Sequence, residues 1–159
     1  MQSGTIAISN GWALYGHPLF LNRLDSLVEE VESLVSDDPK GFHRHAHYKL
    51  FEKVDISIRE RVPCNPAAPE YLQGNTLGKA CRHWRRVKSG LPNRYRLFFQ
   101  YRSDTPSSII YAWLNDEATL RKDGARTDVY TVFKRMLSSG EMPATYNALL
   151  KASGPVASH

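Results

Sequence analysis

The sequence predicts an α+β fold in which an antiparallel sheet packs against an N-terminal helical hairpin, with a further helix near the C-terminus. Apolar residues repeat at helical spacing in two adjoining segments, at about 20–36 and 40–61. Three strand-like runs follow, at 84–88, 93–102 and 108–115. The links between these runs are short, which favours antiparallel neighbours.

The N-terminal elements are expected in the order strand, helix, helix. The apolar run GWALY at 11–15 predicts a short strand that ends before His17. The helix at 20–36 has one apolar face, formed by Leu24, Leu27, Val28, Val31, Leu34 and Val35. Two aspartates and Pro39 end this helix, and Pro39 suits the first turn of the next one. The short link predicts a helical hairpin.

In the run 93–102, alternate side chains are expected to point to opposite sides of the sheet. We interpret one set as a basic surface, formed by Arg94, Arg96, Phe98, Gln100 and Arg102. We interpret the other set as the core face, formed by Tyr95, Leu97, Phe99 and Tyr101. Arg86 and Lys88 share a face of the preceding run. We expect them to converge with Arg94 and Arg96 on one side of the hairpin.

The C-terminal part is expected to be helical. Asp128 can cap a helix at about 129–138, and a shorter helix follows near 143–151. A chain of 159 residues has the length of one domain. We expect that domain to span 1–153 and a flexible tail to occupy 154–159.

Positive charge is concentrated in the middle of the chain. Eight Lys and Arg but no acidic residue lie between Glu70 and Asp104, although the net charge of the whole chain is only +5. The same interval contains the aromatic residues Trp84, Tyr95, Phe98, Phe99 and Tyr101. Basic residues with aromatic faces favour nucleic acid, and RNA in particular, as the partner. The alternative is a solvated basic sheet face with the aromatic residues in the core.

Cysteine usage and hydropathy favour a cytoplasmic protein. Cys64 and Cys81 match neither a C-x-x-C nor a zinc pattern, which is typical of two reduced thiols. The first residues have no signal-peptide pattern. No uncharged apolar run approaches the roughly 18 residues of a membrane span. We therefore expect no membrane partner.

Three stretches of the chain resemble the YhaV toxins of type II toxin–antitoxin systems. They are NGWALYGHPLF, WRRVKSGLPNRYRLFFQY and IIYAWLNDEATLRKDGARTDVYTVFKRML. YhaV toxins belong to the RelE-like superfamily, so the resemblance implies a RelE-like fold. It also implies ribonuclease activity against mRNA, growth arrest by the free toxin and neutralisation by a PrlF-type antitoxin.

Cleavage of RNA without a metal uses the 2′-OH of the substrate as nucleophile, and needs proton transfer and cations that neutralise the crowded phosphate. We expect Arg86 and Arg96 to clamp this phosphate, because a guanidinium group can bind two oxygens at once. Lys88 and Arg94 complete the cationic site. Lys88 is our choice for the general base or acid, since neighbouring arginines disfavour its charged form. No cofactor or metal is expected.

The resemblance adds a tyrosine to this site. The RelE-like pattern places its central arginine in the motif carried here by Arg94, Tyr95 and Arg96, and often a tyrosine near the start of the last helix. Tyr130 matches that position, and Arg126 lies just before it. Tyr130 is expected to assist proton transfer or to stack on a base. The alternative is an aromatic residue that only packs the helix.

Other residues are candidates for RNA contact: Arg85, Arg102, Asn115, Lys122, Arg126 and His83. His83 has the alternative of an acid or base, although the family pattern gives it no matching role. Asn115 has the alternative of forming a turn. His43 and His47 are four residues apart in the predicted helix, a spacing that can hold zinc. No further ligand lies nearby, so we favour a solvated or RNA-facing patch.

Two function classes remain open from the sequence. The first is an endoribonuclease toxin. The second is a non-catalytic RNA- or ribosome-binding module that uses the same basic face, which predicts salt-sensitive binding without strand scission. The chain has no convincing recognition helix, so contact with DNA is expected only through a complex with the antitoxin.

Overall fold

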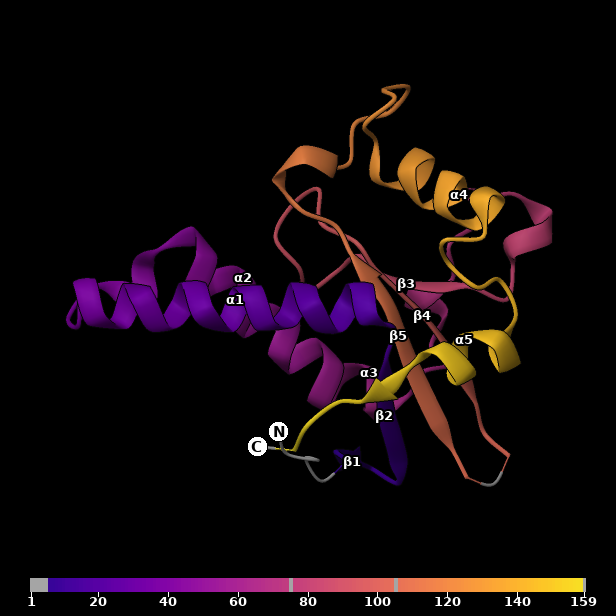
Figure 1. The fold of residues 1–159 in the computed structure, drawn as a ribbon, viewed down its shortest axis with the longest axis horizontal. Helices are drawn as coiled ribbons and strands as arrows, with labels where there is room; N and C mark the ends of the chain where they lie inside the picture. Colours follow the sequence, from indigo (N-terminus) through magenta and orange to yellow (C-terminus); the bar gives the residue numbers. More distant parts are fainter. Residues whose placement is uncertain (1–5, 75, 105, 159) are drawn as a thin grey trace.

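The computed structural model describes residues 6–74, 76–104 and 106–158. It confirms the α+β class, with one sheet and helices on both of its faces (Figure 1). The strands are β1 (Ile8–Ser9), β2 (Trp12–Gly16), β3 (Arg85–Val87), β4 (Leu97–Arg102), β5 (Ser108–Leu114) and β6 (Gly154–Pro155). The helices are α1 (Pro18–Asp37), α2 (Ala46–Ile56), α3 (Val62–Cys64), α4 (Val129–Ser139) and α5 (Tyr146–Ala152). No helix in the described ranges is long and apolar enough to cross a membrane.

The sheet is mixed rather than wholly antiparallel. Its order is β1-β2-β5-β4-β3, and β6 also pairs with β2. β3, β4 and β5 are antiparallel neighbours, as predicted. β2 and β5 pair in parallel, so the prediction of an antiparallel sheet is wrong for this pair. The reason is that the chain between these two strands contains the N-terminal helices as well as β3 and β4, so no short turn constrains the relative direction of β2 and β5.

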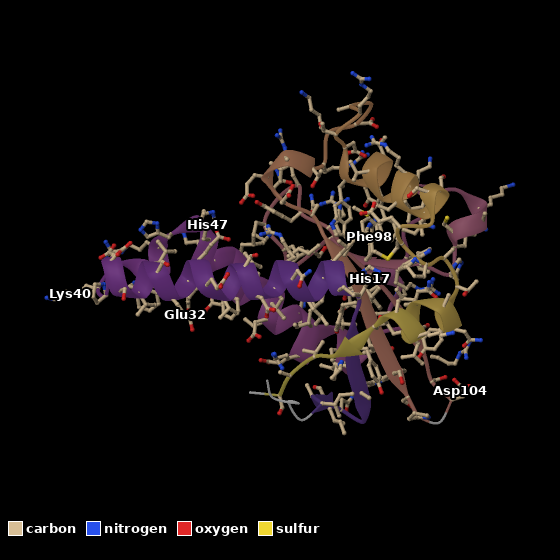
Figure 2. The ribbon with its side chains drawn as sticks, viewed as in Figure 1. His17, Glu32, Lys40, His47, Phe98 and Asp104 are labelled. Carbon is tan, nitrogen blue, oxygen red and sulfur yellow. The ribbon has the colours of Figure 1, made fainter. Side chains whose placement is uncertain are left out.

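α1 and α2 lie side by side, and α1 extends well beyond the edge of the sheet (Figure 1). Apolar residues of both helices form a first core with one face of the sheet. Its members include Phe20, Leu24, Leu27, Leu50, Val54, Leu97, Phe99 and Tyr111. α1 starts two residues earlier than predicted because His17 caps it, with Nδ1 accepting a hydrogen bond from the Leu19 amide at 3.1 Å. His17 lies where α1 meets the sheet (Figure 2), and burial lowers the pKa of its imidazole.

The second helix begins at Ala46, later than the predicted residue 40. Asp38 holds a turn there, because its Oδ1 accepts the Gly41 amide at 3.0 Å. A single 3-10 turn follows at Phe42–Arg44. His43 and His47 therefore do not share one helical face, contrary to the prediction. His47 instead lies near the carboxylates of two acidic residues, Glu30 at 3.2 Å and Glu117 at 3.6 Å.

The second face of the sheet is covered by helices and is not the basic surface that the sequence predicted. Phe98 is fully buried and Gln100 and Arg96 are almost so. α4 and α5 pack on this face and form a second core with Trp84, Phe98, Ile110, Trp113, Phe133 and Leu149. All of β5 is buried, which suits a strand that helices cover on both sides. The prediction of a basic surface was wrong because the alternation of side chains along a strand shows which residues share a face of the sheet. It does not show whether a helix covers that face.

Residues 154–158 do not form the flexible tail expected from the sequence. β6 pairs with β2, and the Val156 side chain is fully buried in the first core. The Val156 amide donates a hydrogen bond to the Leu14 carbonyl at 2.9 Å. The Val156 carbonyl accepts a hydrogen bond from the Ala7 amide at 2.8 Å. The polar, small residues of this segment have no periodic pattern, so their pairing depends on a neighbour distant in sequence.

Replacing Phe133 tests the second core. Its ring stacks on Phe98 with centroids 4.1 Å apart and meets Trp84 edge-on at 4.9 Å. We expect Phe133→Ala to reduce the free energy of unfolding by about 3–5 kcal/mol, because the variant leaves a cavity among aromatic rings. Urea denaturation measures this loss. Ser138→Ala, at an exposed position of α4, is the control, and an equally small effect of both changes would contradict the description of this core.

Candidate active site

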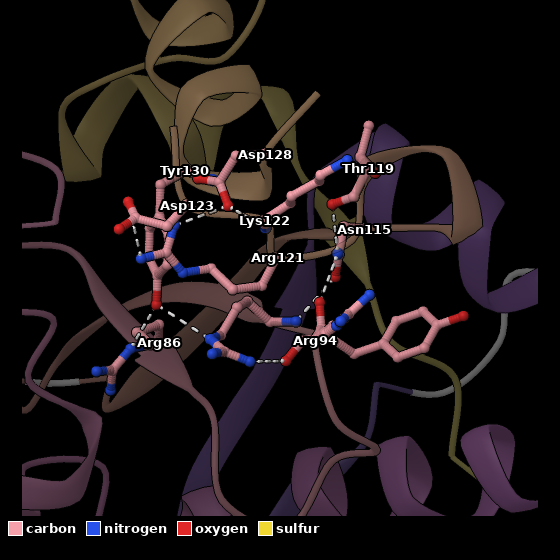
Figure 3. A network of polar contacts seen from close by, with 11 residues as sticks. Arg86, Arg94, Asn115, Thr119, Arg121, Lys122, Asp123, Asp128 and Tyr130 are labelled. Atoms are coloured by element: carbon pink, nitrogen blue, oxygen red, sulfur yellow. Dashed lines mark hydrogen bonds and ion pairs between the residues drawn. The ribbon is translucent and has the colours of Figure 1, made fainter. Parts of the chain in front are cut away.

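A tyrosine and two arginines meet on the second face of the sheet. Tyr130 lies in the first turn of α4, Arg86 in β3 and Arg96 immediately before β4. The phenol Oη of Tyr130 accepts hydrogen bonds from Arg86 Nε at 2.8 Å and from Arg96 Nε at 3.1 Å (Figure 3). These three residues, all named from the sequence, are therefore brought together; we call them the arginine–tyrosine cluster.

Strand register explains why the two arginines face the same helix. Arg86 pairs directly with Phe98 across β3 and β4. Arg96 lies two residues before Phe98 and shares its face. Phe98 packs under α4, and its ring meets that of Tyr130 edge-on at 5.7 Å. The core contact between the sheet and α4 therefore brings the phenol to both guanidinium groups.

Each arginine of the cluster keeps one terminal nitrogen unpaired. Arg86 Nη1 donates to the Glu70 carbonyl at 3.3 Å, and Arg96 Nη1 donates to the Tyr95 carbonyl at 2.9 Å. Nη2 of each residue has no partner in the part of the chain that the structure describes. A charged N–H group without a partner is a ready donor to a phosphate oxygen. Two such donors beside a phenol can neutralise a negatively charged transition state.

Asn115 fixes the segment that carries the arginines. It is fully buried, and its Oδ1 accepts the Arg96 amide at 2.8 Å. Its Nδ2 donates to the Arg94 carbonyl at 3.1 Å and to the Thr119 carbonyl at 2.7 Å (Figure 3). Both polar atoms of this side chain are therefore used within the protein, and contact of Asn115 with RNA stays a prediction.

Arg94 has a left-handed backbone, with φ of +73°. This conformation is strained in a residue that has a side chain. It interrupts the predicted strand, so β4 begins at Leu97 rather than at residue 93. The expected alternation therefore does not include Arg94, whose side chain is exposed. Its carbonyl is held by Asn115 and by the Arg121 amide, which donates to it at 2.9 Å.

Arg121 is a site residue that the sequence reasoning missed. Its guanidinium lies 5.0 Å from the centroid of the Tyr130 ring and donates to Asp128 Oδ1 at 2.8 Å. It lies in the third of the stretches that resemble the YhaV toxins, but no local periodicity connects it with Asp128, seven residues later. Sequence reasoning gave Asp128 only the role of a helix cap. The structure confirms that cap, since Oδ2 accepts the Tyr130 amide at 3.1 Å.

Asp128 holds Arg121, the Lys122 backbone and the start of α4 together. Its Oδ1 also accepts the Lys122 amide, at 2.6 Å (Figure 3). Burial by itself would raise the pKa of this carboxyl. The hydrogen bonds from Arg121 and from two backbone amides outweigh burial and lower the pKa below its ordinary value. The bond to Asp128 likewise raises the pKa of Arg121.

The remaining candidates lie outside the cluster. Arg85 lies on the opposite face of β3, with its guanidinium 5.8 Å from the Tyr101 ring. Arg102, at the far end of β4, stacks on Tyr146 at 4.2 Å. His83 Nε2 lies 2.8 Å from the Ala144 carbonyl. These three residues do not join Tyr130.

Lys88, Lys122 and Arg126 are exposed cations near the cluster in sequence. Lys88 immediately follows β3, two residues after Arg86. Its side chain makes no hydrogen bond or ion pair within the described ranges. Lys122 and Arg126 lie in the loop between β5 and α4. Their roles in proton transfer and RNA contact stay predictions.

Cationic side chains gathered at a phenol, on a sheet covered by helices, define a site suited to the phosphate chemistry of a nuclease. A family model for YhaV toxins, described as toxins with endonuclease activity of a toxin–antitoxin system, matches residues 14–154. The chain belongs to this family. The expected resemblance is thereby confirmed, as is the expectation of a nuclease from a toxin–antitoxin system.

Curated relatives cover most of the chain. The ribonuclease toxin YhaV of Escherichia coli K12 is 46% identical over 143 residues, which span 89% of this chain and 92% of that protein. The toxin YhaV of Escherichia coli O6:H1 is 47% identical over 141 residues, which span 88% and 90%. No solved structure matches the chain.

Replacing Asp128 by Asn tests whether this carboxylate stabilises the contact between Arg121 and the start of α4. Because folding lowers the pKa of Asp128, its carboxylate stabilises the protein fully above its unfolded-state pKa of about 3.9. That stabilisation is lost as the pH falls through the lower folded-state value. We expect Asp128→Asn to reduce the free energy of unfolding at pH 7 by about 2 kcal/mol, because Arg121 and two backbone amides lose a charged hydrogen-bond acceptor.

Urea denaturation over a pH series measures both effects. The variant is expected to lose the part of the acid sensitivity that Asp128 contributes. Asp123→Asn, which removes the exposed second carboxylate near Arg121, is the matched control. Identical pH dependence of the wild type and Asp128→Asn would contradict this role of Asp128.

Proposed function

We propose that this protein is an endoribonuclease toxin of a type II toxin–antitoxin system, which cleaves mRNA without a metal and stops translation and growth until an antitoxin binds it. The arginine–tyrosine cluster carries the proposal. Two guanidinium groups with unpaired Nη2 atoms flank one phenol oxygen, and this set can bind and polarise a phosphodiester. The ribonuclease named among the relatives supports RNA as the substrate.

The proposed reaction breaks the RNA chain by internal displacement. The 2′-oxygen loses its proton and bonds to the adjacent phosphorus, while the bond from phosphorus to the 5′-oxygen breaks and that oxygen gains a proton. The products are a 2′,3′-cyclic phosphate and a 5′-hydroxyl. Negative charge grows on the phosphate oxygens in between, where the Nη2 atoms of Arg86 and Arg96 stabilise it.

Two residues are proposed for proton transfer. The Tyr130 oxygen already accepts two N–H groups from charged arginines, so its own proton is directed to a third partner. In the complex this partner is an oxygen of the RNA at the scissile bond. Lys88 is the second candidate, and it supplies or receives the other proton. Arg94, Lys122 and Arg126 are exposed and extend the cationic surface along the RNA.

We further propose a RelE-like fold that forms one domain, action in the cytoplasm where mRNA is translated, and a PrlF-type antitoxin as the partner. A mixed sheet with paired N-terminal helices on one face and α4 on the other supports the RelE-like relation. Contact with DNA is assigned to the antitoxin complex. Cleavage on the ribosome is an outcome that the experiment below separates from cleavage of free RNA.

Single substitutions in the cluster test the chemistry. Tyr130→Phe keeps the ring in the core and removes the hydroxyl, and we expect a loss of cleavage rate of about 10²-fold or more. Arg86→Ala and Lys88→Ala test the phosphate clamp and the second proton-transfer residue. Lys151→Ala, at an exposed position of α5, is expected to leave the rate unchanged. Each purified protein is incubated with a defined single-stranded RNA in EDTA, and the ends of the products are identified.

Products with a 2′,3′-cyclic phosphate that disappear in Tyr130→Phe and Arg86→Ala would support the proposed site. Full activity of both variants, with unchanged unfolding midpoints, would place the site elsewhere. RNA that is bound but stays intact, with and without translating ribosomes, would favour the binding-module alternative. Cutting at a bond whose 2′-OH has been removed would contradict the mechanism.

An antitoxin that covers the site must meet the exposed cations around it. We expect Arg94→Ala to weaken capture of the toxin by its antitoxin about tenfold, because a rim charge facing an acidic segment speeds association. Surface plasmon resonance at low and high salt measures this change. Unchanged affinity and unchanged association rate would indicate docking on α1 and α2 instead.

A further inference from the structure

A pocket of about 220 Å³ opens beside the arginine–tyrosine cluster. The loop that precedes α4 forms one wall and the first two turns of α4 form another. Its lining includes Thr76, Arg121, Asp123, Tyr130, Thr131 and Lys134. Tyr130 belongs to both the pocket and the cluster. The pocket therefore lies next to the cluster that binds the scissile phosphate in the proposed reaction.

Lys134 is the unpaired cation of this pocket. It is exposed, and its side chain makes no ion pair or hydrogen bond with any residue that the structure describes. Arg121, the other cation, differs because it is bonded to Asp128 and lies 3.6 Å from Asp123. Lys134 lies four residues after Tyr130 on α4. This spacing corresponds to a rise of about 6 Å along the same side of the helix.

Asp123, which also lines the pocket, provides an accessible acceptor. Its side chain is 95% exposed, and its contact with Arg121 is long at 3.6 Å. A carboxylate accepts hydrogen bonds from the exocyclic amino groups of adenine, cytosine and guanine, whereas uracil carries only carbonyl oxygens outside its ring and has its N3–H donor within the ring. The pocket thus pairs a site for a phosphate, at Lys134, with a site for the edge of a base, at Asp123.

We propose that this pocket binds the nucleotide next to the scissile phosphate, with its phosphate on Lys134 and an amino group of its base on Asp123. The proposal rests on the proposed function, because an internal phosphodiester of RNA always has a nucleotide attached on each side. One helical turn separates Tyr130 from Lys134. An RNA strand with one phosphate at the arginine–tyrosine cluster can therefore continue along α4 and bring its next phosphate to Lys134. The pocket then selects bases with an amino group over uracil at this position.

Binding of an uncleavable RNA tests the phosphate contact separately from catalysis. A single-stranded oligonucleotide with 2′-O-methyl groups throughout lacks the nucleophile and stays intact. Its affinity is measured over a series of salt concentrations. We expect Lys134→Ala and Lys134→Gln to reduce the slope of log affinity against log salt by about 0.7, the value for one phosphate contact to a single strand. Lys134→Arg is expected to retain the slope, and Lys151→Ala is the matched control.

Cleavage of a random-sequence RNA tests the base contact. We expect the wild type to cut poorly where uracil occupies one fixed position beside the broken bond. Asp123→Asn is expected to reduce that discrimination about tenfold, because the amide alters the acceptor on the base edge. Sequencing of the cleaved ends measures the preference, and unfolding midpoints of all variants confirm that they are folded.

The outcomes separate this inference from the proposed function. RNA that is bound and cut by the wild type, with an unchanged salt slope in Lys134→Ala and an unchanged base preference in Asp123→Asn, would overturn the pocket assignment alone. RNA that is neither bound nor cut, free or on ribosomes, would overturn both. A reduced slope together with a relaxed preference supports the pocket as a nucleotide subsite.

Discussion

The packing of α4 against the sheet is the interaction on which the rest of the site depends. Phe98 and Phe133 stack with centroids 4.1 Å apart, and this contact fixes the distance between the helix and the sheet. Tyr130 lies three residues before Phe133, on the same side of α4. Its hydroxyl therefore extends from the edge of an aromatic core to the guanidinium groups of Arg86 and Arg96. An apolar contact thus determines where a polar group meets its partners.

Burying charged side chains beside such a core is costly unless their polar atoms are paired. Arg96 is only 7% exposed, and it donates from Nε to Tyr130 and from Nη1 to a backbone carbonyl. Asn115 holds the Arg96 amide. The same asparagine and the Arg121 amide hold the carbonyl of Arg94, whose backbone strain costs about 1–3 kcal/mol. The cationic groups of the candidate site are thereby held in place by contacts within the protein itself.

The sequence predicted the elements better than it predicted what covers them. Helical spacing identified α1, and an aspartate before an apolar stripe identified the start of α4, because both patterns are local. The parallel pairing of β2 with β5 was not predictable, since ninety-odd residues separate the strands and no turn connects them. The covering of Phe98 and Gln100 was missed for a related reason, since alternation says nothing about a helix that arrives later in the chain.

For the site, Arg86, Arg96 and Tyr130 were identified through basic character and family resemblance. Arg121 was missed because its partners Asp128 and Arg94 are brought to it only by the fold. Arg85 and Arg102 were included because they share the same basic stretch, although register places Arg85 on the other face and Arg102 at the far end of β4. Proximity in sequence therefore does not show which cations meet at one place in the fold, and contact of Arg85 and Arg102 with RNA stays a prediction.

The pairing of β6 with β2 has a consequence for how the protein folds. Val156 lies in the first core, and its backbone bonds to Leu14 in β2 and to Ala7. About 140 residues of chain separate Val156 from these partners, and contacts across so long a loop form only after the chain entropy of closing that loop has been lost. We therefore expect the helices, whose contacts are local, to form early, and this edge of the sheet to close late in folding.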